Sequence, residues 1–215
     1  MHIPDGFLSP QTYLPAYAVC AGLWWVGMGR LRAALDEETL PYVAVLTALS
    51  FVLMMVAIPL PGGTTAHAAG IALLAVNFGV WMAFLAVSLV LAMQALLFGD
   101  GGITALSVNA LAMGLLGSLS AWLAWRMIKP VNEVAALVLA GWFSVVLPAL
   151  LVALVLGIQP AIAHDAGGRP LFFPFGLAVT LPAVLIPHAL MGVGEGVLTW
   201  LGYRYLTRLR SRHAT

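Results

Sequence analysis

The sequence contains very few charged residues. Asp, Glu, Lys and Arg make up 8% of the 215 residues, 62% are hydrophobic, and the mean hydropathy is +1.03. Soluble domains contain about 25% charged and 45–50% apolar residues, so a water-soluble fold is excluded. Because a membrane-spanning helix needs about 20 apolar residues, the chain has room for about seven. We therefore predict an all-α integral membrane protein, with residues 1–215 forming a single membrane-embedded bundle of about seven transmembrane helices.

Cysteine and lysine each occur once. Cys20 alone forms neither an intrachain disulfide nor a thiolate metal site. Lys129 lies in no P-loop pattern, so any ATP hydrolysis must take place on another subunit. The net charge of +1 does not indicate a nucleic-acid partner. Since Met1–Pro15 lacks the basic residues of a secretory signal, we expect the mature chain to begin at Met1.

Apolar runs between charged or Gly/Pro-rich breaks predict the membrane spans. Asn77-Phe78-Gly79 is a weak break, so the third and fourth spans could also be one long helix. With seven spans and the N-terminus outside, only Arg169 of the nine basic residues lies outside. This agreement with the positive-inside rule favours seven spans, N-out and C-in. The predicted spans are Tyr13–Gly29, Tyr42–Pro59, His67–Val80, Trp81–Phe98, Ile103–Met127, Val134–Gly157 and Gly176–Tyr203.

The N-terminus has the residues of a metal chelate. The α-amine of Met1, the deprotonated backbone nitrogen of His2 and its imidazole Nδ1 can close two adjoining chelate rings around one metal. Pro4 favours an extended Ile3, and Asp5-Gly6 favours a turn, so the terminus could be tucked into the bundle from the outer face. The alternative is a mobile chain end.

A second histidine could complete this site. His67 follows Pro61-Gly62-Gly63-Thr64-Thr65-Ala66 and is expected at the outer end of the third span. An imidazole nitrogen from His67 would give four nitrogens in a plane, a geometry that favours Ni(II) or Cu(II), with Co(II) also compatible. The alternative is a histidine that hydrogen-bonds a neighbouring helix.

Several other polar residues are candidates for surrounding the metal. Asp100 lies in a predicted outer loop, and Thr104, Ser107 and Asn109 follow it at spacings that bring several of them onto one helical face. Alternatively, Asp100 caps the helix that follows it. We expect the surrounding residues to be Asp5, Thr64, Thr65, Asp100 and Asn109.

The last predicted span contains two ionisable residues. His188 and Glu195 are seven positions apart, so they share one face of the helix. Such residues in a membrane need a partner, water or a neutral state. We interpret the pair as structural, because the predicted topology places Glu195 toward the cytoplasmic half, away from the proposed metal.

Three motifs stand out: Met1-His-Ile-Pro-Asp-Gly6, Pro61-Gly-Gly-Thr-Thr-Ala-His67 and Gln94-Ala-Leu-Leu-Phe-Gly-Asp-Gly-Gly-Ile-Thr-Ala-Leu-Ser-Val-Asn109. Together they resemble the CbiM/NikM family, the substrate-capture components of energy-coupling-factor nickel and cobalt transporters. In that family the terminal amine, the backbone and side-chain nitrogens of the second-position His and a later loop His hold the metal, and these map onto Met1, His2 and His67. Thr65 and Ala66 stand where the family usually has Ser-Gly, which affects the tuning of the site.

The resemblance implies a non-enzymatic subunit of an importer in a bacterial or archaeal plasma membrane. Its implied partners are a membrane coupling protein, two ATP-binding cassette subunits and in some systems a small additional membrane subunit. No permanent cofactor is expected, and Ni²⁺ or Co²⁺ is the transported ligand.

Two other functions remain open. An intramembrane metalloenzyme would need an open metal position, and the chain has no His-Glu-x-x-His motif. A capture subunit for an organic vitamin would need an apolar, aromatic-lined outer cavity. The residues do not decide between nickel and cobalt.

Overall fold

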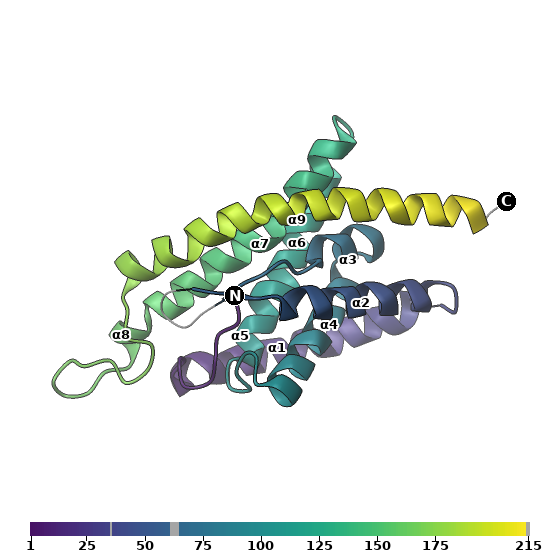
Figure 1. Cartoon of the computed structure of the whole chain (residues 1–215). Coiled ribbons are helices and arrows are strands. Elements are labelled where there is room, and N and C mark those ends of the chain that lie inside the picture. Colours follow the sequence, from purple (N-terminus) through teal and green to yellow (C-terminus); the bar gives the residue numbers. More distant parts are fainter. Residues whose placement is uncertain (35, 61–64, 214–215) are drawn as a thin grey trace.

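The computed structural model describes residues 1–34, 36–60 and 65–213, which are mostly helical (Figure 1). A short two-stranded antiparallel ribbon, β1–β2, precedes α3. Two π-helical stretches, η1 and η2, lie within longer helical runs. In chain order the elements are α1 (Pro10–Ala34), α2 (Thr39–Met55), β1 (Ile58–Pro59), β2 (Thr65–Ala66), α3 (Ile71–Phe78), α4 (Val80–Met93), η1 (Gln94–Phe98), α5 (Leu106–Asn109), η2 (Ala110–Leu116), α6 (Gly117–Ile128), α7 (Glu133–Gly157), α8 (Gln159–Ile162) and α9 (Leu177–His213).

Each of the seven predicted spans overlaps a helix, but the helices differ in length. The third is α3, whose eight residues extend about 12 Å, too short for a hydrocarbon core of about 30 Å. Among the described residues, four helical stretches are long and apolar enough to cross a membrane. The count of seven spans and their orientation therefore stay predictions. The four stretches are Val80–Phe98, Leu106–Ile128, Glu133–Ile162 and Leu177–Leu209.

The predicted break between the third and fourth helices is confirmed. Gly79 has a φ of +83°, in the left-handed region, and separates α3 from α4. Only glycine adopts this conformation without steric cost. Asn77 donates from Nδ2 to the carbonyl of Leu73 at 2.8 Å, within the same short helix. The two segments are therefore separate helices.

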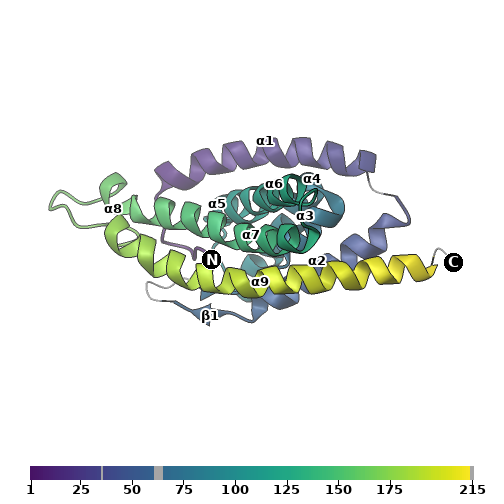
Figure 2. The same cartoon turned by 90° about the horizontal axis from the view of Figure 1, so that it is seen from above.

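Helices α7 and α9 lie side by side in close contact (Figures 1 and 2). A Cβ atom on Gly141 would come 2.6 Å from the Cα of Gly196, so the backbones approach as they do at small-residue helix interfaces. Nearby, Trp142 packs over Gly192 and donates from Nε1 to the Ala189 carbonyl at 3.1 Å. Gly192 and Gly196 thus serve internal packing and fix α9 on α7.

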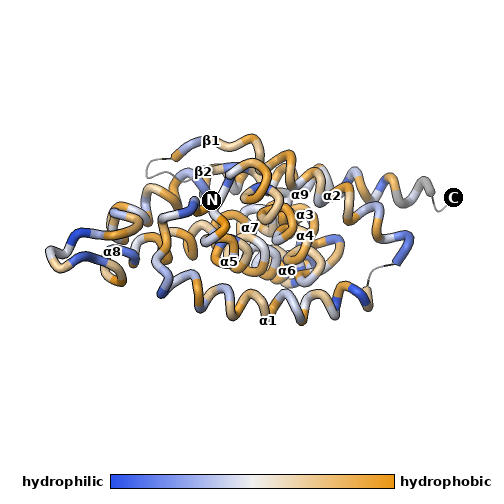
Figure 3. Tube along the Cα trace, turned by 90° about the horizontal axis from the view of Figure 1, so that it is seen from below, coloured by the Kyte–Doolittle hydropathy of each residue, from blue (hydrophilic) through white to orange (hydrophobic). Residues whose placement is uncertain are grey.

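The outer surface of the molecule exposes many large apolar side chains. Trp25 is 84% exposed, Leu190 72% and Leu97 67%. Figure 3 shows hydrophilic segments at the loop beyond α8 and at the connection from α1 to α2, with mostly hydrophobic helices between them. An apolar surface of this extent is suited to lipid, in agreement with the predicted integral membrane protein.

The N-terminal segment is packed inside the bundle. Met1 and Ile3 have no exposed surface. The amide of Gly102 donates to the Ile3 carbonyl at 2.9 Å, and a Cβ atom at Gly102 would overlap the backbone of Asp5. The predicted insertion of the N-terminus into the bundle is therefore confirmed, and the segment lies against the loop after η1.

Candidate metal centre

The terminal amine of Met1 is buried beside His67. It donates to the carbonyl of Thr65 and lies 3.3 Å from Nε2 of His67. Burial away from water lowers the pKa of this amine from 8.0 to about 4, although the nearby charge of Asp100 opposes the shift. At neutral pH the nitrogen is therefore unprotonated, the state that a metal ligand requires.

The His2 ring lies on the His67 ring. The two rings are stacked, with centroids 4.7 Å apart and an interplanar angle of 21°. Nδ1 of His2 lies 3.1 Å from Oδ1 of Asp100, although the contact lacks regular hydrogen-bond geometry. Burial lowers the pKa of His2, and the contact with Asp100 partly opposes this. Met1, His2 and His67, hereafter the metal centre, thus bring together nitrogen donors from two segments far apart in the sequence.

Asn109 fixes the backbone next to the metal centre. Its Oδ1 accepts from the amide of Ile3 at 3.1 Å, and its Nδ2 donates to the Ile3 carbonyl at 3.2 Å. Asn109 is only 2% exposed. This two-point contact holds the residue that follows His2 and so limits how far the N-terminus can move.

Two aspartates were expected near the site, and each has a different role. Asp5 accepts from the amides of Ile103 and Thr104 at 3.1 and 2.8 Å. Asp100 instead faces His2. The alternative expectation that Asp100 caps the next helix is therefore wrong, since Asp5 satisfies the amides leading into α5. Thr65 contributes the carbonyl next to the amine, whereas Thr64 lies outside the described residues.

Sequence reasoning did not single out Gln94 as a site residue. Its side chain has no exposed surface, and neither polar atom of its amide has a hydrogen bond in the described part of the structure. It lies close enough to His2 to interact with that ring. Its sequence signals were a polar amide within an apolar run and its place at the start of the motif that ends at Asn109.

Glu195 was expected to lie away from the proposed metal, but helix α9 contacts the loop that carries His67. Oε2 of Glu195 accepts from the amide of Ala69 at 2.8 Å, two residues after His67. His188 interacts electrostatically with His67. His188 and Glu195 each have a hydrogen-bond partner in the backbone, as the structural interpretation requires. However, Glu195 contacts the loop that carries His67, a candidate ligand.

Side chains alone do not form a metal cluster in the described residues. No three His, Cys, Asp or Glu side chains within residues 1–34, 36–60 and 65–213 are grouped so that they could hold a metal ion. A site of three or more protein ligands therefore needs donors other than these side chains, and the buried N-terminus offers the Met1 amine and the His2 amide. Imidazole nitrogen suits zinc, iron, copper and nickel, and a square-planar arrangement of nitrogen donors would favour nickel or copper, with cobalt also compatible.

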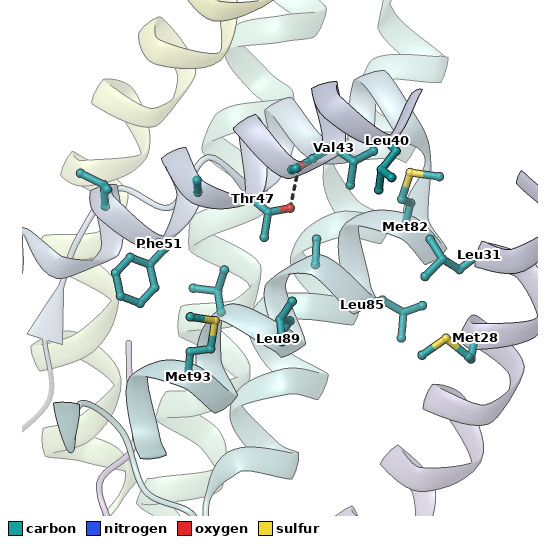
Figure 4. A pocket seen from close by; sticks show the side chains of 15 residues that line it. Met28, Leu31, Leu40, Val43, Thr47, Phe51, Met82, Leu85, Leu89 and Met93 are labelled. Carbon is teal, nitrogen blue, oxygen red and sulfur yellow. Dashed lines mark hydrogen bonds between the residues drawn. The ribbon is translucent and has the colours of Figure 1, made fainter. Parts of the chain in front are cut away.

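A separate apolar groove lies between α1, α2 and α4 (Figure 4). Its volume is about 650 Å³. Phe51 is the one aromatic residue and Thr47 the one polar residue among the described residues that line it. The Thr47 hydroxyl is already bonded to the Val43 carbonyl at 2.7 Å. The groove therefore offers no free polar group to orient an organic ligand.

Comparisons with known proteins give a consistent result. Residues 2–213 match the family described as cobalt uptake substrate-specific transmembrane region, CbiM. The chain is 42% identical over 213 residues to a fused nickel transport protein, NikMN, of Rhodobacter capsulatus, covering 94% of this chain and 61% of that protein. It is 40% identical to a probable fused nickel transport protein, LarMN, of Lactiplantibacillus plantarum, covering 97% of this chain and 65% of that protein. The chain thus spans less than two thirds of the length of both relatives.

A solved structure shares the fold. The crystal structure of a truncated transition metal transporter superposes with a TM-score of 0.93 at 39% sequence identity, covering 97% of this chain and 99% of that one. A second crystal structure of a transition metal transporter gives the same TM-score and identity, covering 93% of that chain. The arrangement of helices around the buried N-terminus therefore has a counterpart among proteins described as metal transporters.

Proposed function

The chain belongs to the CbiM family of cobalt uptake substrate-specific transmembrane regions, and we propose that it captures Ni(II) or Co(II) at the metal centre. The burial of an unprotonated terminal amine 3.3 Å from His67 carries this proposal. A mobile chain end would remain in water and keep its proton at neutral pH.

The metal is held by four nitrogens in a square plane. The amine of Met1, the deprotonated amide nitrogen of His2 and Nδ1 of His2 supply three of them, and Nε2 of His67 supplies the fourth. Stacked rings direct their nitrogen lone pairs into different planes, so binding requires the His2 ring to turn away from Asp100. Asp5, Thr65, Asp100 and Asn109 support the ligands through the contacts described above, and the proposed set also includes Thr64.

Residues 1–215 act as one membrane-embedded metal-capture domain of an energy-coupling-factor importer. The lack of a P-loop supports a division of labour in which two ATP-binding cassette subunits hydrolyse ATP. A membrane coupling protein connects them to this chain, and a small additional membrane subunit can join them. We expect this complex in the plasma membrane of a bacterium or archaeon, and the names of the relatives support a role in transport.

The N-terminus faces the outside and the C-terminus faces the cytoplasm. Trp125 packs on Tyr203 with ring centroids 5.2 Å apart, and Lys129 and Arg204 lie over Trp125 and Trp200. This gathering of basic residues near one end supports the positive-inside assignment. With Cys20→Ser as background, an impermeant thiol reagent should label Ala166→Cys but not Ser211→Cys in intact cells. The reverse labelling would invert the topology.

A vitamin-binding function has less support. The apolar groove has one aromatic side chain and an already bonded hydroxyl, so it lacks anchors for a polar vitamin. A metalloenzyme would need an open position for water, which four in-plane nitrogens do not leave in that plane.

The test is calorimetry of the purified chain with Ni²⁺ and Co²⁺, compared with His67→Ala. The unsubstituted chain should bind one metal ion. His67→Ala should bind more weakly with a shifted visible spectrum, because three of the four nitrogens remain. Absence of binding by the unsubstituted chain would overturn the proposed function, and an unchanged spectrum in the variant would remove His67 from the site.

A further inference from the structure

Helix α9 carries two buried ionisable side chains that the metal centre does not use. His188 and Glu195 have no exposed surface and lie seven positions apart on one face of the helix. An ionisable group inside a membrane protein is costly to bury, so the partner that it contacts indicates its role. Both side chains are directed at the same short segment, the loop that carries His67.

Glu195 holds the end of that loop. Its Oε2 accepts from the amide of Ala69 at 2.8 Å, and the carboxylate also interacts with the amides of Gly70 and Ile71. These amides form the start of α3, where a helix has no backbone partners of its own. A carboxylate is well suited to this position because it accepts several N–H groups and complements the helix dipole. The contact joins positions 126 residues apart in the chain.

His188 lies at the other flank of His67. Its Nδ1 donates to the Val184 carbonyl at 2.7 Å, and its Nε2 side lies beside the carbonyl of Thr65 without a regular hydrogen bond. That carbonyl accepts from the Met1 amine. Helix α9 therefore contacts the chain two residues before and two residues after His67.

Further contacts fix the loop after His67 and the turn of α9 that carries Glu195. Ser50 of α2 donates from Oγ to the Ala69 carbonyl at 2.6 Å. The Thr199 hydroxyl bonds the carbonyl of Glu195 at 2.8 Å, and the close approach of Gly196 to Gly141 fixes this turn of α9 on α7. Because both polar groups of Ala69 are engaged, the backbone after His67 has little freedom to rotate.

We propose that Glu195 is a positioning residue for metal binding, which fixes the direction of His67 Nε2 through its hydrogen bond to the Ala69 amide. Glu195 does not touch the metal. It fixes the position of the fourth ligand, the Nε2 atom of His67, relative to the three nitrogens of the N-terminus. Because the loop that carries His67 is already ordered, metal binding does not have to order it. This role rests on the proposed function, since it has meaning only if His67 is a ligand.

The test is a double-mutant cycle between Glu195 and His67 in the purified full-length chain, with Ni²⁺ as the probe. Glu195→Ala should weaken binding by about 10- to 100-fold, as outer partners of metal ligands commonly do, and should shift the visible spectrum as His67→Ala does. In the His67→Ala background, Glu195→Ala should have almost no further effect. Independent contributions would instead multiply.

Three further variants separate positioning from general stability. Glu195→Gln keeps an oxygen that accepts from the Ala69 amide. Its Ni²⁺ affinity should stay within about threefold of that of the unsubstituted chain, a smaller loss than removal of one hydrogen bond typically causes. Glu195→Asp keeps the carboxyl group but shortens the reach, so it should weaken binding and shift the spectrum, even if Glu195→Ala does not fold. Thr180→Val, which removes another buried polar group of α9, should leave the spectrum unchanged.

Native affinity and spectrum in folded Glu195→Ala or Glu195→Asp would overturn the positioning role. It would also be overturned if the losses of affinity from Glu195→Ala and His67→Ala multiplied in the double variant. These results would leave the proposed function intact, because the unsubstituted chain would still bind. If the unsubstituted chain bound no Ni²⁺, the proposed function would fail and the positioning role would fail with it.

Discussion

The metal centre and the apolar groove between α1, α2 and α4 differ in how their polar groups are arranged. At the metal centre the nitrogens of Met1, His2 and His67 are buried together, and hydrogen bonds hold the neighbouring backbone. In the groove the one polar side chain is bonded within its own helix. A groove without directed polar groups is suited to lipid or to packing against another apolar surface, whereas converging nitrogen atoms are suited to a metal ion. Substitutions in the two regions should therefore have very different effects on metal binding.

The largest effect is expected at His2. His2→Ala removes Nδ1 and breaks the second chelate ring, so Ni²⁺ affinity should fall by more than about 100-fold, beyond the usual contribution of an outer partner. The fold should be retained, since the apolar helices still pack. Calorimetry gives the affinity, and thermal unfolding without metal serves as the control. A loss smaller than that of His67→Ala would contradict the assigned ligands.

A smaller effect is expected at Asn109, which supports the ligands without touching the metal. Asn109→Ala frees the amide of Ile3 and leaves the Gly102 amide as the remaining donor to the Ile3 carbonyl, so the N-terminus would be held less firmly. Affinity should fall by about 10- to 100-fold. Asn109→Asp keeps the acceptor for the Ile3 amide and should lose less. Equal losses in both variants would mean that the hydrogen bond from the Ile3 amide does not support binding, and would contradict this part of the role of Asn109.

The sequence predicts more of the fold than of the contacts around the metal centre. Composition and the Gly79 break located the helices because hydrophobic runs and glycine conformation are local properties. The nitrogens of Met1, His2 and His67 were also brought together as expected. The partners of Asp5 and Glu195 were not foreseen, because which distant amide a carboxylate meets depends on tertiary packing. Their sequence signal is only that a charged group stands in an apolar chain.

The pH dependence of binding tests the buried state of the amine. Its pKa is lowered from 8.0 to about 4, so between pH 5.5 and 7.5 it carries no proton for the metal to displace. The pKa of His2 is also lowered. Only the amide proton of His2 is then released, and log affinity should rise by about one per pH unit. A slope of two in calorimetry over this range would indicate that the amine is protonated, as in an exposed terminus.

The smallest effect is expected in the groove. Leu89 lines it and is 57% exposed. Leu89→Ala should change Ni²⁺ affinity by less than about twofold, because distant sites with no shared partners act independently. The same titration as for His2→Ala provides the comparison. A loss approaching that of Asn109→Ala would mean that the groove and the metal centre are coupled.

The most direct measurement is Ni²⁺ binding by a chain with one Gly added before Met1. The addition turns the Met1 amine into a peptide nitrogen and displaces the first chelate ring, while every side chain remains. A Gly added after Thr215 is the matched control. We predict that the N-terminally extended chain folds with nearly unchanged thermal stability but loses Ni²⁺ binding, whereas the C-terminal control binds normally. Native affinity in the N-terminally extended chain would show that the amine is not a ligand and would contradict the proposed square of four nitrogens.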